Sequence, residues 1–176
     1  MTAPRLAQSA ALNDLLLYRI SRLLSVAGAP VIRLCEGQFG ITRREWRVLA
    51  LLAQEEGLLS SQLAGRVQLD RARTSKAITS LVSKQLLLRE QRPSDRRQVR
   101  IALTEQGRRT YSALFPLVRE INQGLMHDLS ESDIRHLDRL LDALQQRADI
   151  LSAGPAEPGS PKADRRLGGR AARKTD

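Results

Sequence analysis

The sequence has few aromatic residues, a single cysteine and no long apolar run. Aromatic side chains make up 3% of its 176 residues, which argues against binding of single-stranded nucleic acid by base stacking. Cys35 has no second cysteine with which to form an internal disulfide, as is usual in a reducing compartment. No apolar stretch approaches the roughly 18 residues of a membrane span, and the N-terminus does not resemble a secretion signal. We therefore expect a cytoplasmic protein that does not act in a membrane.

Acidic residues are also in short supply. Lysine and arginine number 29 against 19 aspartates and glutamates, so the net charge is +10 and the pI is near 11.0. A protein this basic usually binds a polyanion, either nucleic acid or an anionic membrane surface. Hydrophobic residues make up 41% of the chain, which is enough to bury the core of one domain with appendages.

The middle of the chain contains two short segments with helical apolar periodicity, followed by two segments that alternate like strands. The helical segments are residues 60–67 and 70–84, the polar break between them is residues 68–70, the strand-like segments are 87–91 and 99–103, and an arginine-rich loop joins the strands at 92–97. Helix, turn, helix and basic hairpin together predict a winged helix-turn-helix, a fold that reads double-stranded DNA. The expected fold class is therefore mainly α with a small β-wing.

The second of these helices has one face without acidic residues. At about 100° per residue, one side carries Thr74, Ile78, Leu81 and Val82, and the other carries Arg73, Lys76, Thr79, Ser80 and Ser83. A solvated polar face would normally mix glutamate with lysine, so the pattern favours a face that lies in a DNA groove. A solvated face remains the alternative.

The wing loop concentrates positive charge. Arg92, Arg96 and Arg97 repel one another on one short hairpin, and a phosphate backbone or a narrow minor groove would relieve that repulsion. Asp95 is close enough in sequence to orient the guanidinium of Arg97. An exposed ion pair contributes little to stability, so orientation is the role we expect for it.

The candidate DNA contacts lie at the start of the first helix, along the second helix and on the wing. They are Ser60, Ser61, Arg71, Arg73, Thr74, Ser75, Lys76, Thr79, Ser80, Arg92, Asp95, Arg96 and Arg97. Arginine prefers guanine, but the sequence does not say which side chain reads a base. The serines could also act only as local caps, a role that is compatible with phosphate contact.

Apolar stripes on the flanking helices exceed what a compact winged motif can cover, which predicts a two-fold dimer. We expect four segments: residues 1–38, an N-terminal dimerisation helix region; 39–104, the winged helix-turn-helix lobe; 105–153, the C-terminal dimerisation helices; and 154–176, a disordered basic tail. The tail has six basic and three acidic residues, a net charge of +3 that could add non-specific DNA affinity. A tail without function is an equal alternative.

An effector pocket is the second site that the sequence suggests. Aromatic and cationic residues of the flanking and first lobe helices are its candidates: Tyr18, Arg22, Trp46, Tyr111 and Phe115. An arginine beside aromatic rings suits a carboxylate on a ring, although each aromatic could simply be core. His127 and His136 do not form a metal-ligand spacing with Cys35, so we expect no metal and no cofactor. Cys35 could be a redox-sensing thiol, but a buried structural cysteine is the preferred interpretation.

A family resemblance rests on named residues spread across the lobe. They are Ile41 to Leu49, Leu63-Ala64, Leu69-Asp70-Arg71, Ser75-Lys76, Leu81, Leu86-Leu87, Arg89, Asp95-Arg96-Arg97 and Leu103-Thr104-Glu105-Gln106-Gly107. With these residues the chain resembles the MarR (multiple antibiotic resistance regulator) family of bacterial transcription factors, in helix order from about Leu12 to Leu151. Two departures are Gln85, where the family commonly has glycine, and Leu59, where a capping serine or threonine is frequent. Glutamine at a left-handed position costs about 1 kcal/mol, which leaves the end of that helix open.

The resemblance implies an obligate homodimer whose N- and C-terminal helices interlock. It also implies that residues 70–84 occupy the major groove, that Arg97 reaches the minor groove, and that half-sites of a pseudo-palindromic operator lie about 10 bp apart. Most relatives of this kind resemble repressors that a small ligand releases, often an aromatic or phenolic acid. The expected function is such a repressor.

This function has four alternatives. A non-specific architectural DNA binder and a redox repressor that uses Cys35 are the alternatives that remain. An adaptor that does not bind DNA is disfavoured by the basic face of residues 70–84. An enzyme is not expected, because no nucleophile–base pair, phosphate-binding glycine loop or carboxylate pair is recognisable.

Overall fold

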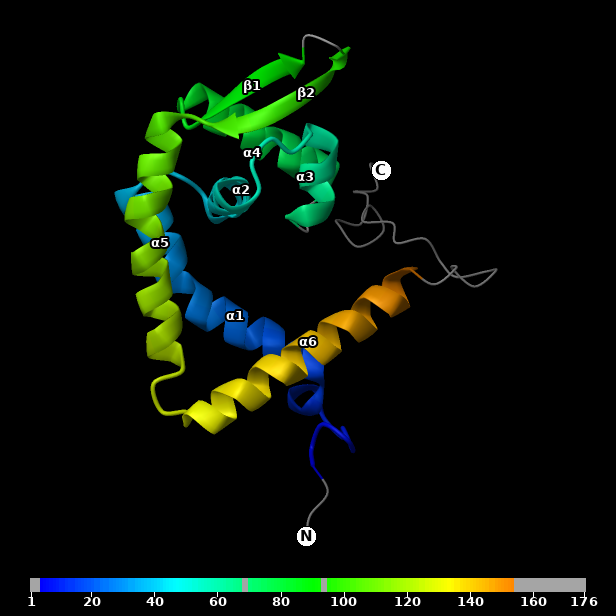
Figure 1. The fold of residues 1–176 in the computed structure, drawn as a ribbon. Coiled ribbons are helices and arrows are strands. Elements are labelled where there is room, and N and C mark those ends of the chain that lie inside the picture. The colour runs from blue at the N-terminus through cyan, green and yellow to red at the C-terminus, as the bar shows by residue number, and fades with distance from the viewer. Residues whose placement is uncertain (1–3, 68–69, 93–94, 154–176) are drawn as a thin grey trace, which may run out of the picture. The chain divides into compact units, whose positions relative to one another are not determined.

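The computed structural model describes residues 4–67, 70–92 and 95–153, with the side chains of residues 91–98 excepted. Its elements are a 3-10 turn (Leu12–Asp14), α1 (Leu16–Arg33), a π-helical turn (Leu34–Gln38), α2 (Arg43–Gln54), α3 (Ser60–Arg66), α4 (Arg71–Ser83), β1 (Leu87–Arg92), β2 (Asp95–Leu103), α5 (Glu105–Leu125) and α6 (Glu131–Ala153) (Figure 1). The predicted fold class, helical with a small two-stranded wing, is confirmed. The chain divides into two compact units, Met1–Asp128 and Leu129–Asp176.

Local caps explain where the lobe helices begin. At the start of α2, the Thr42 hydroxyl oxygen accepts the Glu45 N–H at 3.2 Å, and Glu45 Oε2 accepts the Thr42 N–H at 2.6 Å. This reciprocal arrangement is a capping box. Asp70 Oδ1 accepts the Arg73 N–H at 2.8 Å to begin α4, and Thr104 Oγ1 accepts the Gly107 N–H at 2.9 Å to begin α5. Each cap satisfies a backbone donor that the first helical turn leaves unpaired.

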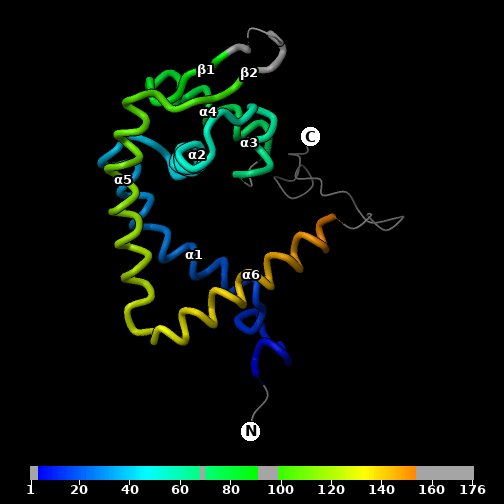
Figure 2. The backbone as a smooth tube through the Cα atoms, in the orientation of Figure 1, coloured from blue at the N-terminus to red at the C-terminus, as the bar shows by residue number. Residues whose placement is uncertain are grey.

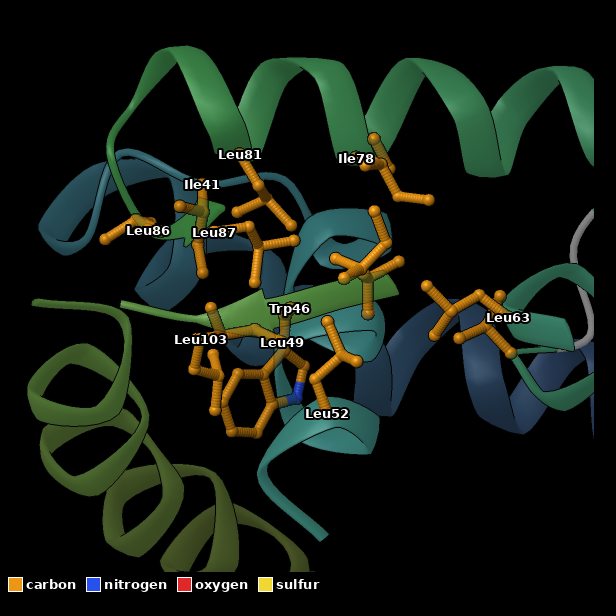
Figure 3. Close-up of a cluster of buried hydrophobic side chains, with 14 of the residues drawn as sticks. Ile41, Trp46, Leu49, Leu52, Leu63, Ile78, Leu81, Leu86, Leu87 and Leu103 are labelled. Atoms are coloured by element: carbon orange, nitrogen blue, oxygen red, sulfur yellow. The ribbon is translucent and has the colours of Figure 1, made fainter. Parts of the chain in front are cut away.

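The core of the first unit lies between α2, α3, α4 and the sheet (Figure 3). Leu49 and Leu52 of α2, Leu63 of α3 and Leu81 of α4 are all fully buried there. Burial of such a side chain stabilises the fold by roughly 1.5–3 kcal/mol. Because three helices and the sheet all contribute to this core, it sets the position of α4 on the lobe.

The wing is an antiparallel pair with regular register from Leu87↔Leu103 to Gln91↔Val99, and an irregularity before Arg92. Its base is tied to the segment before α3, because the Ile101 N–H donates to the Leu58 carbonyl at 3.0 Å. The backbone then runs from β2 directly into α5, which passes α2 and reaches α1 (Figure 2).

The end of α4 follows the glycine-type geometry despite its glutamine. Gln85 has φ +59°, the Leu86 N–H donates to the Leu81 carbonyl at 2.9 Å, and the Gln85 N–H donates to the Val82 carbonyl at 3.0 Å. These two bonds define a Schellman motif. The question that the sequence left open is thereby answered: the helix ends as if glycine were present, and Gln85 bears the left-handed strain.

A real glycine requirement exists nearby, at the start of α5. A Cβ atom on Gly107 would overlap the Leu86 carbonyl oxygen and crowd Leu103. Glycine here allows the first turn of α5 to pack against the backbone of Leu86, a residue between α4 and β1.

The helices outside the core expose large apolar side chains. On α1, Leu17 is 79% exposed and Val26 is 72% exposed. Helix α6, taken by itself, exposes an apolar stripe that includes Leu137, Leu140 and Leu144. In the described part of the chain, no helix is both long and apolar enough to span a membrane.

Candidate nucleic-acid interface

Helix α4 presents its basic residues to solvent because its other side is held in the core. Ala77, Ile78 and Leu81 are buried against α2 and α3. The remaining side carries the exposed residues Arg71, Arg73, Ser75, Lys76 and Thr79. This outward face contains no acidic residue, so its electrostatic potential favours an anionic partner.

Two of these side chains are oriented by neighbours. Arg73 Nε lies 3.1 Å from Asp70 Oδ2, the residue that caps the same helix. Arg89 of β1 donates from Nη2 to the Thr79 hydroxyl at 3.0 Å. The wing therefore contacts the outward face of α4 through Arg89, a residue that the sequence analysis did not include among the DNA contacts. Its alternation on β1 next to an acid-free helix face is the signal that could have found it.

A depression of about 640 Å³ lies between α3, α4 and the sheet. It brings together four of the predicted residues with Arg89, and its lining is Leu59, Ser60, Ser61, Ala64, Arg71, Ser75, Arg89, Val99 and Ile101. Two guanidinium groups and three hydroxyls supply donors without any carboxylate in the lining. Such a set of donors suits a phosphate oxygen.

Two predicted contacts are placed differently from the rest. Thr74 is 1% exposed and its hydroxyl donates to the Asp70 carbonyl at 3.0 Å, so its inclusion among the DNA contacts is corrected: it is a core residue. Its position on the apolar side of the helix wheel already indicated this. Ser80 is half-buried and hydrogen bonds to the Glu45 carboxylate, so its hydroxyl is directed into the lobe.

The wing contacts predicted at Arg92, Asp95, Arg96 and Arg97 lie on the ends of β1 and β2, where Arg92 pairs with Asp95. Their side chains lie outside the described part of the structure. The basic tail at 154–176 also lies outside the described residues.

A buried carboxylate lies behind the outward face of α4. Glu45 is 2% exposed. Burial alone would raise its pKa, but hydrogen bonds from Ser80 and the Thr42 N–H, together with the hydrogen bond and charge of Lys84, hold the pKa below its usual value. Glu45 is therefore ionised at neutral pH and paired with a cation at the end of α4.

A second concavity, of about 500 Å³, lies between α1, α2 and α5. Its lining is mostly aliphatic: Ile20, Leu23, Leu24, Ala27, Gly28, Pro30, Val31, Arg43, Trp46, Arg47, Val118, Ile121, Asn122 and Leu125. Of the five residues predicted for an effector, it includes Trp46 alone. Tyr111 stacks on Trp46 with ring centroids 5.8 Å apart, and Phe115 lies 5.4 Å from Tyr111, so these two rings are neighbours of the lining. Tyr18 and Arg22 are exposed on α1 and do not reach it.

The cations of this cavity are Arg43 and Arg47, which the sequence analysis missed. Their i, i+4 spacing on either side of Trp46 is the signal that could have found them. The guanidinium of Arg43 lies over Gly28 of α1, where a Cβ would be 2.9 Å from its Nη1. Burial, and then the charge of Arg43, lower the pKa of Arg47. Among the described residues neither arginine forms an ion pair, although Glu36 borders both across a shallow depression.

Cys35 is fully buried in the core. Burial raises the pKa of its thiol, and the charge of Glu36 raises it further. The thiolate is the reactive form of cysteine, so both effects oppose a sensing role. Among the described residues, no group of three or more histidine, cysteine or acidic side chains is placed to hold a metal ion.

A helix-turn-helix followed by a two-stranded wing, with an acid-free recognition helix, defines the class of winged helix-turn-helix DNA-binding proteins. Residues 41–99 match the model of the MarR family. The chain is therefore similar, over its winged helix-turn-helix lobe, to the DNA-binding transcriptional regulators of the MarR family. Regulators of this family bind DNA and act as dimers, and they are not enzymes.

One curated relative is the uncharacterised HTH-type transcriptional regulator YhbI of Bacillus subtilis (strain 168). It is 26% identical over 136 residues, which are 77% of this chain and 88% of YhbI. Among solved structures, a MarR/EmrR family regulator from Acinetobacter sp. ADP1 has a TM-score of 0.70 at 23% identity, covering 76% of this chain and 94% of that one. CouR from Rhodococcus jostii RHA1, solved with p-coumaroyl-CoA, has a TM-score of 0.66 at 24% identity, covering 77% of this chain and 95% of CouR. These two structures share the fold of this chain.

Proposed function

We propose that the chain is a cytoplasmic, homodimeric repressor that binds a pseudo-palindromic operator and is released from it by a small organic acid. The observation that carries the proposal is the outward face of α4, which is basic, free of acidic residues and continuous with the donor-lined depression at Arg71 and Arg89. Such a face fits the major groove with phosphates on its flank.

The contacts divide by their place on the lobe. Arg73, Lys76 and Thr79 face outward on α4 and are the proposed base-edge contacts. Ser60, Ser61, Arg71, Ser75 and Arg89 surround the depression and are the proposed phosphate contacts, and Arg97 of the wing is proposed to enter the minor groove. Loss of a base contact relaxes specificity, whereas loss of a phosphate contact weakens binding to all sequences alike.

The exposed apolar faces of α1 and α6 support the dimer. A monomer in water rarely exposes so many large apolar side chains on two helices, and a second copy would bury them at about 25 cal/mol per Å². Two recognition helices related by a two-fold axis read two half-sites about 10 bp apart, which accounts for a pseudo-palindromic operator.

The cavity between α1, α2 and α5 is the proposed effector site. Its volume of about 500 Å³ lies within the usual range for small-molecule sites. The aliphatic walls suit an apolar body, and Arg43 with Arg47 suits a carboxylate. We therefore favour an aromatic or phenolic acid, and the thioester ligand of CouR suggests adding acyl-CoA forms to the compounds tested.

The test is selection of a duplex from a random pool by the full chain, followed by a competition titration against random duplex. We expect the selected duplex to bind about 10³-fold or more tightly than random duplex at matched salt. Lys76→Ala should lower this ratio, whereas Arg119→Ala, an exposed arginine of α5, should leave it unchanged. A ratio near one would instead identify a non-specific architectural protein.

A further inference from the structure

Glu45 belongs to α2 but also touches the end of the recognition helix. Its Oε2 caps α2 by accepting the Thr42 N–H at 2.6 Å, and both of its carboxylate oxygens accept from Lys84 Nζ, at 3.1 and 2.9 Å. Ser80, one turn earlier on α4, also hydrogen bonds to it. One buried carboxylate therefore joins the first turn of α2 to the last turn of α4.

Lys84 is held on this side of α4 by more than one acceptor. Its ammonium also donates to the Gly40 carbonyl at 2.8 Å, in the turn that precedes α2. With two donors to the carboxylate and one to the carbonyl, the three N–H groups of Lys84 all have acceptors within the lobe. This cation is therefore committed to an internal role at the C-terminal end of α4.

Apolar packing alone does not fix a helix against sliding or rotation as sharply as a hydrogen-bonded ion pair does. The hydrophobic effect that buries Ile78 and Leu81 has no preferred direction. Hydrogen bonds to Lys84 and Ser80 do have direction, and burial of Glu45 makes their loss costly. The depth and rotation of α4 in a groove decide which of its outward side chains reach a base edge.

We propose that Glu45 is a positioning residue for DNA recognition, which sets the placement of α4 through Lys84 and Ser80 without touching DNA itself. This inference rests on the proposed role of α4 as the recognition helix. It assigns to α2 a part in sequence discrimination that the outward face of α4 does not reveal.

The substitution Glu45→Gln distinguishes the positioning role from a purely electrostatic effect on DNA binding, because the two predict changes of opposite sign in the affinity for the selected duplex. Glutamine keeps the side-chain volume and still completes a capping box at α2. It also removes one negative charge and frees Lys84, so an electrostatic role predicts equal or tighter binding to every duplex. A positioning role predicts weaker binding to the selected duplex with binding to random duplex retained.

Glu55→Gln is the matched control. Glu55 is at the other end of α2 and pairs with Arg66 of α3 at 2.7 Å, with both side chains substantially exposed. The substitution makes the same charge change on the same helix and frees an arginine in place of a lysine. The substitution should change the affinities for the selected and the random duplex by the same factor, and it should leave their ratio within about twofold of the wild-type value, since exposed ion pairs contribute little.

The experiment titrates full-length wild type, Glu45→Gln and Glu55→Gln against the selected and the random duplex at matched salt. We expect the ratio of the two affinities to fall roughly tenfold in Glu45→Gln, the size of about one mismatched base pair. Lys84→Met should lower the affinity ratio in the same way, whereas Lys84→Arg, which keeps the cation, should retain the wild-type ratio. The double variant Glu45→Gln/Lys84→Met should lose no more than either single variant.

Each outcome decides a separate point. If Glu45→Gln does not fold, the comparison of Lys84→Met with Arg66→Met decides, because both remove one cation. Equal ratios in wild type, Glu45→Gln and Lys84→Met would overturn the positioning role while leaving the DNA-binding function intact. A wild-type protein that enriches no duplex at all would overturn both the proposed function and this inference.

Discussion

The lobe around α4 buries its large apolar side chains, whereas the helices outside it expose many of theirs. In the lobe, Leu49, Leu63 and Leu81 are fully buried. On α1, Leu17 is 79% exposed, and on α6, Leu151 is 66% exposed. The lobe is complete within one chain, whereas α1 and α6 each have an apolar face that only a further surface can cover.

In the proposed dimer, this difference separates two tasks. A rigid lobe holds α4 in one pose, so its recognition face can match a groove. The outer helices of the proposed dimer would place two lobes at a fixed spacing. Core substitutions should therefore change folding, and substitutions on the outer helices should change assembly.

The largest expected effect is on the lobe core. Leu81→Ala removes a fully buried side chain from α4 and should lower the free energy of unfolding by about 2–5 kcal/mol. Chemical denaturation followed by circular dichroism, at one fixed protein concentration, measures this loss. Leu17→Ala on α1 is the comparison, and it should change lobe unfolding far less. Equal losses from both would remove the distinction between the two regions.

The next effect is on assembly. Leu140→Lys introduces a charge into the exposed apolar stripe of α6, and one buried leucine contributes roughly 1.5–3 kcal/mol. The dimer dissociation constant should therefore rise at least about tenfold, as measured by sedimentation over a range of concentrations. Gln146→Lys lies on the opposite face of α6 by helical spacing and should leave it unchanged. A wild-type chain that sediments as a monomer would contradict the dimer.

The same contrast explains what could be predicted from the sequence. Features set by neighbours in the chain are predictable: the helical periodicities of residues 60–67 and 70–84 and the alternation of the two strands. A second contact of Glu45 could not be found, because Lys84 is 39 residues away and only the packed lobe brings them together. Arg43 was missed for the same reason, since its place over Gly28 depends on how α1 meets α2.

Aromatic residues are poor predictors of the effector cavity in this chain. Residue type predicts Tyr18 and Phe115 as ligand contacts, but the cavity is lined mainly by aliphatic side chains. Residue type indicates what a side chain can do, whereas tertiary packing decides where it is. Thr74 shows the reverse case, because its place on the helix wheel was the better guide than its hydroxyl.

A third prediction concerns pH and tests the polar link within the lobe. The pKa of Glu45 is lowered in the folded chain, so its contribution is fully present above the unfolded value of about 4.3 and is lost as the pH falls through the lower folded value. At neutral pH the free energy of unfolding of wild type should exceed that of Glu45→Gln by about 1.5–3 kcal/mol, the usual contribution of a hydrogen bond to a charged group. Urea denaturation at several pH values should show this difference shrinking below about pH 4. A difference that does not depend on pH would contradict an ionised Glu45.

The smallest effect concerns the end of α4, where the left-handed backbone of Gln85 costs the lobe some stability. Gln85 has φ +59°, and the Schellman bonds around it form as they would with glycine. Gln85→Gly removes the left-handed strain of about 1–2 kcal/mol but adds freedom to the unfolded chain worth about 0.5–1 kcal/mol. The net result should be stabilisation of up to about 1.5 kcal/mol in denaturant unfolding. Gln106→Gly, in the first turn of α5, is the same substitution at an ordinary helical position and should destabilise by roughly the same amount. Opposite signs at the two sites would show that the backbone conformation at Gln85, and not the loss of its side chain, decides the outcome.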